Sequence, residues 1–160
     1  FFDLHLKGGS AAPVLDARAT VFVTGANVWQ DFDRFPPPTA RRVAWHLASG
    51  GRANTAWGNG RLLPDPPAGT QPPDHFIDDP DWPFVAPLAA ARDAEFRYDA
   101  AERERDHGTL VYDSGPLGRP TTILGEPEAE LFVAADTPDA DLVLFIVEHR
   151  ADGRSIVLSR

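Results

Sequence analysis

The sequence predicts an all-β protein, most simply a two-sheet jelly roll. Several short segments alternate apolar and polar residues, which is the period-2 pattern of half-buried strands. Sixteen prolines and thirteen glycines among 160 residues indicate many turns. Strands do not alternate with amphipathic helices, which argues against a parallel α/β fold, and the long connections between strands favour a jelly roll.

The strongest strand signals lie near the end of the chain. Residues 128–135 alternate between an apolar and a polar face, and this predicts a half-buried strand. Residues 142–147, LVLFIV, form an unbroken apolar run, so we expect a strand that is covered on both faces. Asp152 and Gly153 between two apolar runs predict a tight hairpin, because glycine accepts positive φ without steric cost.

Other elements are expected earlier in the chain. Shorter strand signals occur at residues 19–25, 43–48, 109–112 and 121–124. Residues 49–63, SGGRANTAWGNGRLL, are rich in Gly and Asn and predict a looped, hairpin-like crossing. Residues 88–107 have a helix-forming composition but no apolar stripe at helical spacing, so their two signals conflict.

Composition excludes several classes of function. The net charge of −9 and the pI near 4.9 argue against a nucleic-acid partner, which would require a basic surface. The absence of cysteine excludes disulfides, thiolate zinc sites and cysteine nucleophiles. No apolar run approaches the roughly 20 residues of a membrane-spanning helix, so no membrane partner is expected. The chain begins at Phe1 without Met, and its compartment stays open.

The sequence also offers no catalytic constellation. A serine hydrolase places its nucleophile in a G-x-S-x-G turn, and no serine here has Gly at both −2 and +2. The serines are Ser10, Ser49, Ser114, Ser155 and Ser159. The histidines lack the i, i+4 spacing of a helical metal site. They are His5, His46, His75, His107 and His149. We therefore expect no catalytic residue, no metal site and no cofactor.

Three aspartates in one turn are candidates for a calcium site. Asp136, Asp139 and Asp141 are close in sequence, and oxygen-rich loops can hold Ca²⁺. Aspartates in turns mostly hydrogen-bond their own backbone, so the structural interpretation is favoured.

The C-terminal segment resembles a known domain. Gly125, the turn Thr137-Pro138-Asp139-Ala140-Asp141, the apolar run and the hairpin Ala151-Asp152-Gly153-Arg154 follow one pattern. It is similar to the C-terminal non-catalytic domain of the X-Pro dipeptidyl-peptidase, cocaine esterase and α-amino acid ester hydrolase family of serine hydrolases. Ala151, where the family pattern has Pro, is a small departure.

The resemblance extends over essentially the whole chain. Residues 25–29 match "Gly-x-Asn-x-Trp", and residues 51–62 match "Gly-x-x-Asn-Thr-x-x-Gly-x-Gly-x-Leu". Residues 105–117 resemble "Arg-x-Asp-Val-Leu-x-Tyr-x-Ser-x-Pro-Leu", with His107 and Gly108 before Thr109. The resemblance also implies an irregular or extended segment at 88–107, with at most a turn or two of helix.

The family implies a fold and a partner. Its domain is a jelly-roll β-sandwich of the galactose-binding type, which this chain would contain only in part, incomplete at the C-terminus. Residues 1–12 would be the end of an upstream α/β-hydrolase domain and the junction, and residues 13–160 the partial jelly roll. The catalytic triad of the family lies in that upstream domain of the same polypeptide, so this chain would lack it. A homo-oligomer remains open.

One loop is the expected contribution to the substrate pocket. The sequence DWPFVAPL carries four apolar side chains on a proline-stiffened loop: Trp82, Phe84, Val85 and Leu88. The resemblance implies that this loop reaches toward the hydrolase active site and helps to wall the pocket of an enzyme that cleaves an ester or amide. The alternative is that these residues cap the sandwich or dock on the catalytic domain.

A second function remains open, namely a free-standing carbohydrate- or ligand-binding jelly-roll module. Residues 1–9, FFDLHLKGG, make sense only as a domain junction and favour the first function. The second requires an exposed aromatic platform, for which Trp29, Trp57 and Trp82 are the candidates.

Overall fold

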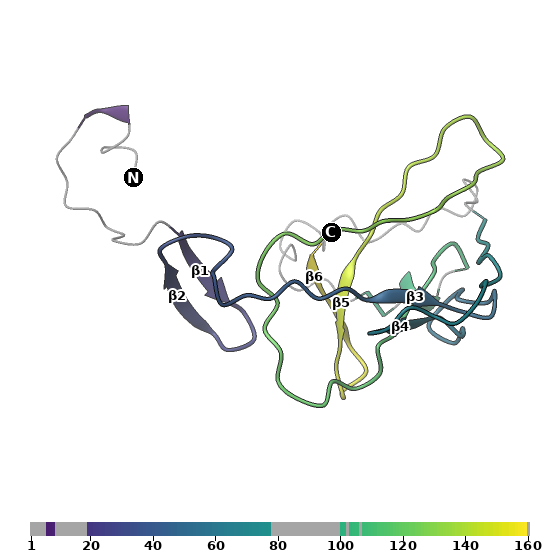
Figure 1. Ribbon diagram of the computed structural model, residues 1–160, viewed down its shortest axis with the longest axis horizontal. Coiled ribbons are helices and arrows are strands. Elements are labelled where there is room, and N and C mark those ends of the chain that lie inside the picture. Colours follow the sequence, from purple (N-terminus) through teal and green to yellow (C-terminus); the bar gives the residue numbers. More distant parts are fainter. Residues whose placement is uncertain (1–5, 9–18, 78–99, 102, 106, 160) are drawn as a thin grey trace. The chain divides into compact units, whose positions relative to one another are not determined.

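The structure, a computed structural model, describes residues 6–8, 19–77, 100–101, 103–105 and 107–159. Its elements are β1 (Ala19–Val23), β2 (Val28–Phe32), β3 (His46–Ala48), β4 (Arg61–Leu63), the 3₁₀ turn η1 (Arg103–Arg105), β5 (Ile146–His149) and β6 (Ser155–Ser159) (Figure 1). The strands pair as three two-stranded antiparallel sheets: β1 with β2, β3 with β4, and β5 with β6. The all-β class is therefore confirmed. No helix in these ranges is long and apolar enough to cross a membrane.

The chain divides into two compact units. The first comprises Phe1–Val43 with Gly118–Phe132, and the second comprises Ala44–Leu117 with Val133–Arg160. The first unit contains the β1–β2 hairpin. The second contains the other two hairpins and η1.

The β1–β2 hairpin of the first unit has an exposed aromatic pair. Its turn is closed by the Asn27 N–H, which donates to the Val23 carbonyl at 2.8 Å, and Asn27 adopts a φ of 56°. Phe22 and Trp29 face each other across the strands with ring centroids 5.0 Å apart. Phe22 is 38% exposed and Trp29 is 69% exposed. A two-stranded hairpin is marginally stable by itself. We therefore expect another surface to cover this apolar face.

Two short hairpins organise the second unit. In β3–β4, His46 pairs with Leu63 and Ala48 with Arg61. In β5–β6, the turn at Gly153 has a φ of +84°, and the Gly153 N–H donates to the Arg150 carbonyl at 3.0 Å. The tight hairpin that the sequence predicts at Asp152-Gly153 is thus confirmed.

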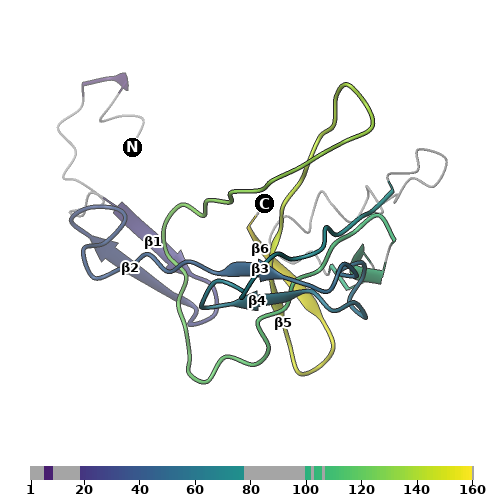
Figure 2. The ribbon, with the colours of Figure 1, turned by 45° about the vertical axis from the view of Figure 1, so that its right-hand side comes forward.

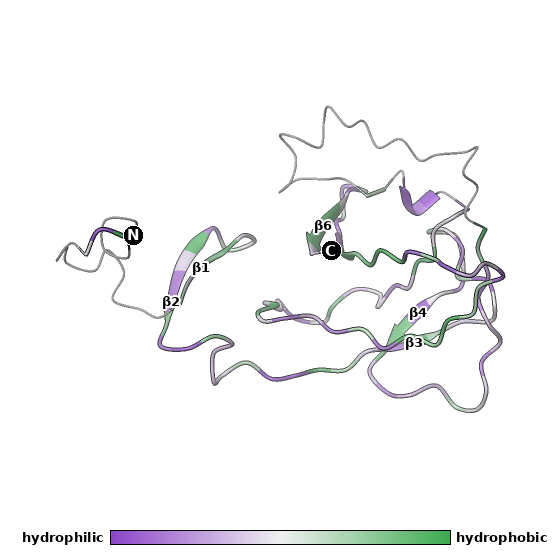
Figure 3. Cartoon of the chain, turned by 90° about the horizontal axis from the view of Figure 1, so that it is seen from above, coloured by the Kyte–Doolittle hydropathy of each residue, from purple (hydrophilic) through white to green (hydrophobic). Residues whose placement is uncertain are grey.

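The described interior of the second unit is built from small and polar residues. The buried ones are Ala53, Thr55, Gly60, Ala100, Glu104 and Ser155. Figure 3 shows the contrast between hydrophobic β6 and hydrophilic η1. Because no large side chain in the described ranges is fully buried, hydrogen bonds connect the segments here.

The predicted strands at residues 121–124 and 128–135 were wrong. Both stretches run without regular strand pairing, and Phe132 is 97% exposed. Alternation shows which side chains would share a face, but a strand forms only where a second backbone pairs with it. In the described ranges, no segment supplies that pairing.

The prediction for residues 142–147 was partly wrong. The strand β5 begins only at Ile146, and Leu142, Val143 and Leu144 are 44%, 66% and 46% exposed. The apolar run therefore predicted the strand but not its start, and its faces are not both covered. The signal at 19–25 is confirmed as β1, and the signal at 43–48 is confirmed over His46–Ala48 as β3, whereas β2 was not predicted.

Gly60 makes a close contact that tests this packing. A Cβ at this position would overlap the carbonyl oxygen of Val111 and would lie 2.9 Å from the Ala53 Cβ. We expect Gly60→Ala to lower the free energy of unfolding by about 1–3 kcal/mol, because the backbone of residues 109–113 would have to move. Urea denaturation measures this difference. Gly118→Ala, where a Cβ meets nothing within 4 Å, is the control. Equal stability of both variants would contradict the contact.

Candidate functional site

The loop that joins β3 to β4, residues 49–60, is the framework of the second unit. The Thr55 N–H donates to the Thr109 carbonyl at 3.0 Å, and the Val111 N–H donates to the Ala53 carbonyl at 2.8 Å. Asn54 and Leu110 form an antiparallel bridge between these bonds. The strand predicted at 109–112 is therefore limited to this short contact.

Asn54 extends the contact with its side chain. Its Nδ2 donates to the His75 carbonyl at 2.5 Å and lies 3.4 Å from the His107 carbonyl. In the same loop, the Asn59 side chain accepts hydrogen bonds instead of donating them. Its Oδ1 accepts from the backbone N–H groups of Gly50 and Arg52, each at 3.2 Å. Asn54 thus contacts other segments as a donor, whereas Asn59 holds the loop together as an acceptor.

Asp74 is the first of two carboxylates that tie segments together. Its Oδ1 accepts from the Ala53 N–H at 2.8 Å. Its Oδ2 accepts from Ser49 Oγ at 2.6 Å and from Tyr112 Oη at 2.7 Å. One side chain therefore links the 49–60 loop to the segment that contains Tyr112.

This network changes the acidity of both titratable members. Burial is the largest influence on Asp74 and opposes its ionisation, but the hydrogen bonds from Ser49, Tyr112 and Ala53 together outweigh it. The pKa of Asp74 therefore lies below its ordinary value. Burial, followed by the bond to Asp74, raises the pKa of Tyr112. The stable arrangement at neutral pH is an ionised Asp74 that accepts from a protonated Tyr112.

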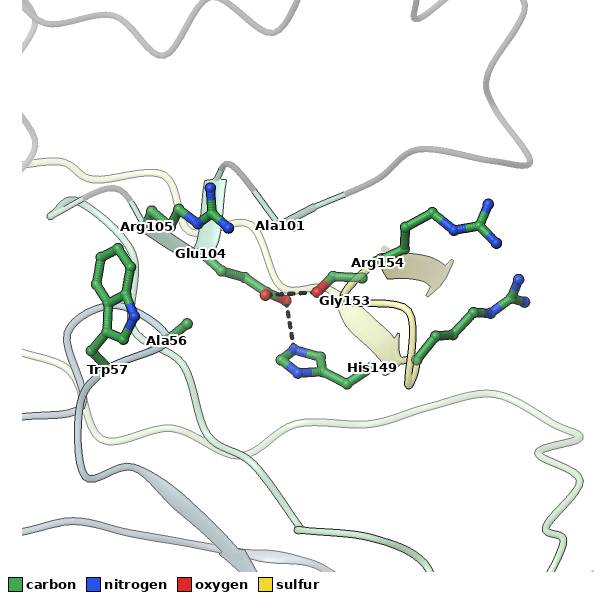
Figure 4. Close-up of a pocket in the computed structure, with 10 residues that line it drawn as sticks. Ala56, Trp57, Ala101, Glu104, Arg105, His149, Gly153 and Arg154 are labelled. Atoms are coloured by element: carbon green, nitrogen blue, oxygen red, sulfur yellow. Dashed lines mark hydrogen bonds and ion pairs between the residues drawn. The ribbon is translucent and has the colours of Figure 1, made fainter.

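Glu104, in η1, is the second such carboxylate. Its Oε1 lies 2.9 Å from His149 Nε2, and its Oε2 accepts from Ser155 Oγ at 2.8 Å (Figure 4). Its carbonyl accepts from the Ala56 N–H at 2.6 Å, which places η1 beside the 49–60 loop (Figure 2). Its side chain is 9% exposed, whereas that of His149 is 45% exposed. Glu104 thus connects the loop to the β5–β6 hairpin.

The cavity next to Glu104 has a volume of about 160 Å³. It is lined by Ala56, Trp57, Ala101, Glu104, Arg105, His149, Arg150, Gly153, Arg154 and Ser155 (Figure 4). This volume is below the roughly 300 Å³ at which small-molecule pockets begin. Two of the arginines make ion pairs at its rim, Arg150 with Glu148 at 2.9 Å and Arg154 with Asp152 at 2.7 Å.

The serine, carboxylate and histidine beside this cavity have the wrong order for nucleophilic catalysis. A triad requires histidine between the serine and the acid, so that it can take the serine proton. Here Glu104 lies between Ser155 and His149. Ser155 is also only 2% exposed, so a substrate carbonyl could not reach its oxygen. This arrangement therefore serves as a structural link between segments.

Comparison with known proteins places the chain in a family. Residues 10–160 match the sequence profile of the X-Pro dipeptidyl-peptidase C-terminal non-catalytic domain. The chain belongs to this family. It is also 29% identical to a cocaine esterase from Rhodococcus sp. (strain MB1 Bresler) over an alignment of 161 residues. This alignment covers 99% of the chain. The match spans 28% of the length of that relative.

The structure brings together motif residues of this X-Pro dipeptidyl-peptidase C-terminal domain that the sequence analysis had noted without a role. Asn54 and Thr55 form the centre of the 49–60 loop, and Tyr112 bonds to Asp74. Asp74 and Glu104 themselves were missed. Glu104 lies in the charged run AERERD, which is typical of a solvated surface, and only the fold shows that one of its carboxylates is buried.

The predicted pocket-lining residues lie outside the described residues. They are Trp82, Phe84, Val85 and Leu88, and their role stays a prediction. Trp82 of the proposed aromatic platform lies there too. The other two platform residues are in different units, and both are exposed, Trp29 at 69% and Trp57 at 75%.

The histidines and the aspartate turn can be placed as well. His75 and His107 contribute their carbonyls to Asn54, His149 contacts Glu104, His46 is in β3, and His5 lies outside the described residues. In the aspartate turn, Thr137 Oγ1 donates to the Asp139 carbonyl at 2.8 Å. Within the described ranges, no three His, Asp or Glu side chains are grouped so that they could hold a metal ion.

Asp74 predicts a specific acid dependence of stability. Because its folded pKa is lowered, its stabilising effect is present above the ordinary carboxyl value of 3.8 and is lost as the pH falls through the lower folded value. We expect Asp74→Asn to cost about 1–2 kcal/mol at pH 7 and less at pH 3, measured by urea denaturation across this range. Asp65→Asn, an equal charge change at an exposed turn, should keep the wild-type profile. A constant deficit for Asp74→Asn at all pH values would contradict this assignment.

Glu104 should contribute more to the free energy of unfolding than a surface glutamate of the same unit. We expect Glu104→Ala to lower the free energy of unfolding by about 2–3 kcal/mol, because charged hydrogen bonds to Ser155 and His149 are lost in a buried position. Glu148→Ala removes an ion pair whose side chains are 40% and 48% exposed, and should cost less than about 1 kcal/mol. Thermal and chemical unfolding of the two variants measure the difference. Similar losses would refute the central place of Glu104.

Proposed function

We propose that this chain is the non-catalytic C-terminal β-sandwich part of an X-Pro dipeptidyl-peptidase or cocaine-esterase-like serine hydrolase. It stabilises the catalytic domain of the same polypeptide and helps to wall the substrate pocket. The observation that carries the proposal is the family match over residues 10–160, together with a relative of which the chain spans 28%.

The proposal includes a fold and a division of the chain. Residues 13–160 form a partial jelly roll of the galactose-binding type, and residues 1–12 are the end of the α/β-hydrolase domain and the junction. The small antiparallel sheets support a β-sandwich, the architecture in which antiparallel sheets pack face to face. The family description supports the separation of this part from the catalytic domain.

Stabilisation of the catalytic domain is argued from exposed apolar side chains. In the first unit, Phe22 and Trp29 lie on a hairpin that has little cover of its own. In the second unit, Leu142, Val143 and Leu144 are exposed in sequence. A large apolar side chain contributes roughly 1.5–3 kcal/mol when it is fully buried. A docked catalytic domain that covers either set would therefore be held firmly, and each partner would stabilise the other.

Fixed positions on both sides of the segment that carries Trp82, Phe84, Val85 and Leu88 support its role as a pocket wall. Upstream of it, Asp74 is bound by three donors from two other segments. Downstream of it, Glu104 is bound by two other segments. Apolar groups at a domain interface are a common form of substrate site.

The parent enzyme hydrolyses an ester or an amide through an acyl-enzyme. Its serine attacks the substrate carbonyl, and its histidine, oriented by an acid, moves the proton. All three residues belong to the catalytic domain in this proposal. The residues of this chain bind and enclose the part of the substrate away from the reacting carbonyl.

A carbohydrate-binding module is the second candidate function. The exposure of Trp29 and Trp57 favours it, because sugars stack on open aromatic rings. Against it, the two side chains belong to different units, and no shared platform follows from their exposure.

The proposal predicts where the activity resides. The full polypeptide that contains this chain should hydrolyse an aryl ester, and a serine-directed inhibitor should abolish the turnover. The isolated chain should show no turnover, because the nucleophile lies in the catalytic domain. A spectrophotometric ester assay on both proteins measures this. Inhibitor-sensitive turnover by the isolated chain would overturn the proposal. A saturable change in its tryptophan fluorescence on titration with oligosaccharides would favour the second candidate.

A further inference from the structure

The cavity beside η1 has a positively charged lining in an acidic protein. The chain as a whole carries a net charge of −9. Three arginines line this cavity, Arg105, Arg150 and Arg154, and Glu104 is the acidic side chain among them. Glu104 is already engaged, because its two carboxylate oxygens have partners at 2.9 and 2.8 Å (Figure 4). The lining therefore suits an anionic ligand.

The three arginines differ in how far their charges are balanced. Arg150 donates from Nε and Nη2 to Glu148 at 3.0 and 2.9 Å. Arg154 donates from Nε to Asp152 at 2.8 Å. The exposed Arg105 side chain makes no hydrogen bond or ion pair with the part of the chain that the structure describes. Its guanidinium group presents N–H donors in one plane and is available to a ligand.

A tryptophan lies at the same cavity on a constrained turn. Trp57 is 75% exposed and belongs to the lining. Two positions before it, Thr55 adopts a φ of 61°, which is uncommon for a residue other than glycine. Directly after it, a Cβ on Gly58 would overlap the Arg52 carbonyl oxygen and would lie 2.7 Å from the Asn54 carbonyl oxygen. The backbone that carries the exposed indole ring therefore has few alternative conformations.

The volume of the cavity sets the size of the ligand. It is about 160 Å³, and an apolar cavity of about 150 Å³ is large enough to bind benzene. One aromatic ring therefore fits, whereas larger ligands occupy pockets of roughly 300 Å³ or more. Aromatic rings stack on one another, and a guanidinium group forms paired hydrogen bonds with a carboxylate. Trp57 and Arg105 supply these two kinds of contact.

We propose that this cavity binds a small aromatic carboxylate, with the ring against Trp57 and the carboxylate on Arg105. Figure 4 shows these two side chains on the same side of Glu104. Arg150 and Arg154 add to the positive potential, so a neutral ligand of the same shape binds weakly. The inference does not depend on the proposed function, because all of its residues belong to the second unit.

The probes are nicotinate and nicotinamide, which share a ring and a shape but differ in charge at neutral pH. Ligand-observed NMR titration of the full polypeptide that contains this chain gives the Kd of each probe. A serine-directed inhibitor is present throughout, so that a catalytic pocket does not contribute to the binding.

Two variants of the cavity are compared with two matched controls. Arg105→Gln removes the charge, and Trp57→Ala removes the ring. Arg52→Gln changes an exposed arginine of the same loop as Trp57 that does not line the cavity. Trp29→Ala changes the exposed tryptophan of the first unit. Circular dichroism verifies that each variant is folded.

We expect nicotinate to bind about tenfold or more tightly than nicotinamide, because only the carboxylate forms charged hydrogen bonds. Arg105→Gln should remove most of this preference, and Trp57→Ala should weaken nicotinate binding by about threefold or more. Both controls should keep the wild-type Kd values. Equal Kd values for the two probes, no binding of either, or a nicotinate Kd that either cavity variant leaves unchanged would overturn the inference. Binding of oligosaccharides but of neither probe, lost in Trp57→Ala, would replace it by the carbohydrate-binding function.

Discussion

The segment Ala53-Asn54-Thr55 is the element on which the second unit depends, through its backbone and through the Asn54 side chain. On one side it bonds to Asp74 and His75, and on the other side to residues 107–111. Strands β3 and β4 have three residues each, which is too short for a stable sheet by itself. The loop between them supplies the missing order, because its donors and acceptors are used by segments that are distant in the sequence.

The two carboxylates give this unit a polar interior with defined partners. Asp74 and Glu104 each accept hydrogen bonds at both of their oxygens. Glu104 is buried and Asp74 is half-buried, and removing a carboxylate from water is costly unless it is paired in this way, so each network permits few alternative arrangements. Apolar packing alone would fix the relative positions of these segments less precisely.

The sequence predicted the all-β class, the β5–β6 turn and the strands β1 and β3, since these follow from local signals. Gly153 illustrates this, because its turn requires a positive φ, and glycine at that position signals the turn without information from distant residues. The exposed stretch around Phe132 illustrates the opposite case. Its alternation was real, but strand formation requires a partner backbone, and no local pattern records one.

The same distinction applies to the candidate site. The family motifs contained Asn54, Thr55 and Tyr112, yet their roles depend on contacts with Asp74, His75 and His107. Those contacts join residues separated by tens of positions, and a single sequence contains no sign of them. Glu104 was hidden for a further reason. It sits among other charged residues, and helical or strand periodicity cannot show which one is turned inward.

The anchoring of Asp74 on one side, and of Ala100 and Glu104 on the other, also bears on how such a domain can diversify. Lengthening a loop whose ends are already fixed adds little entropic cost, about 0.6 kcal/mol for each doubling of its length. Length changes among residues 78–99 should therefore be tolerated, while changes at Asp74 and Glu104 should not. One stretch of chain can then change in evolution without a redesign of the scaffold that carries it.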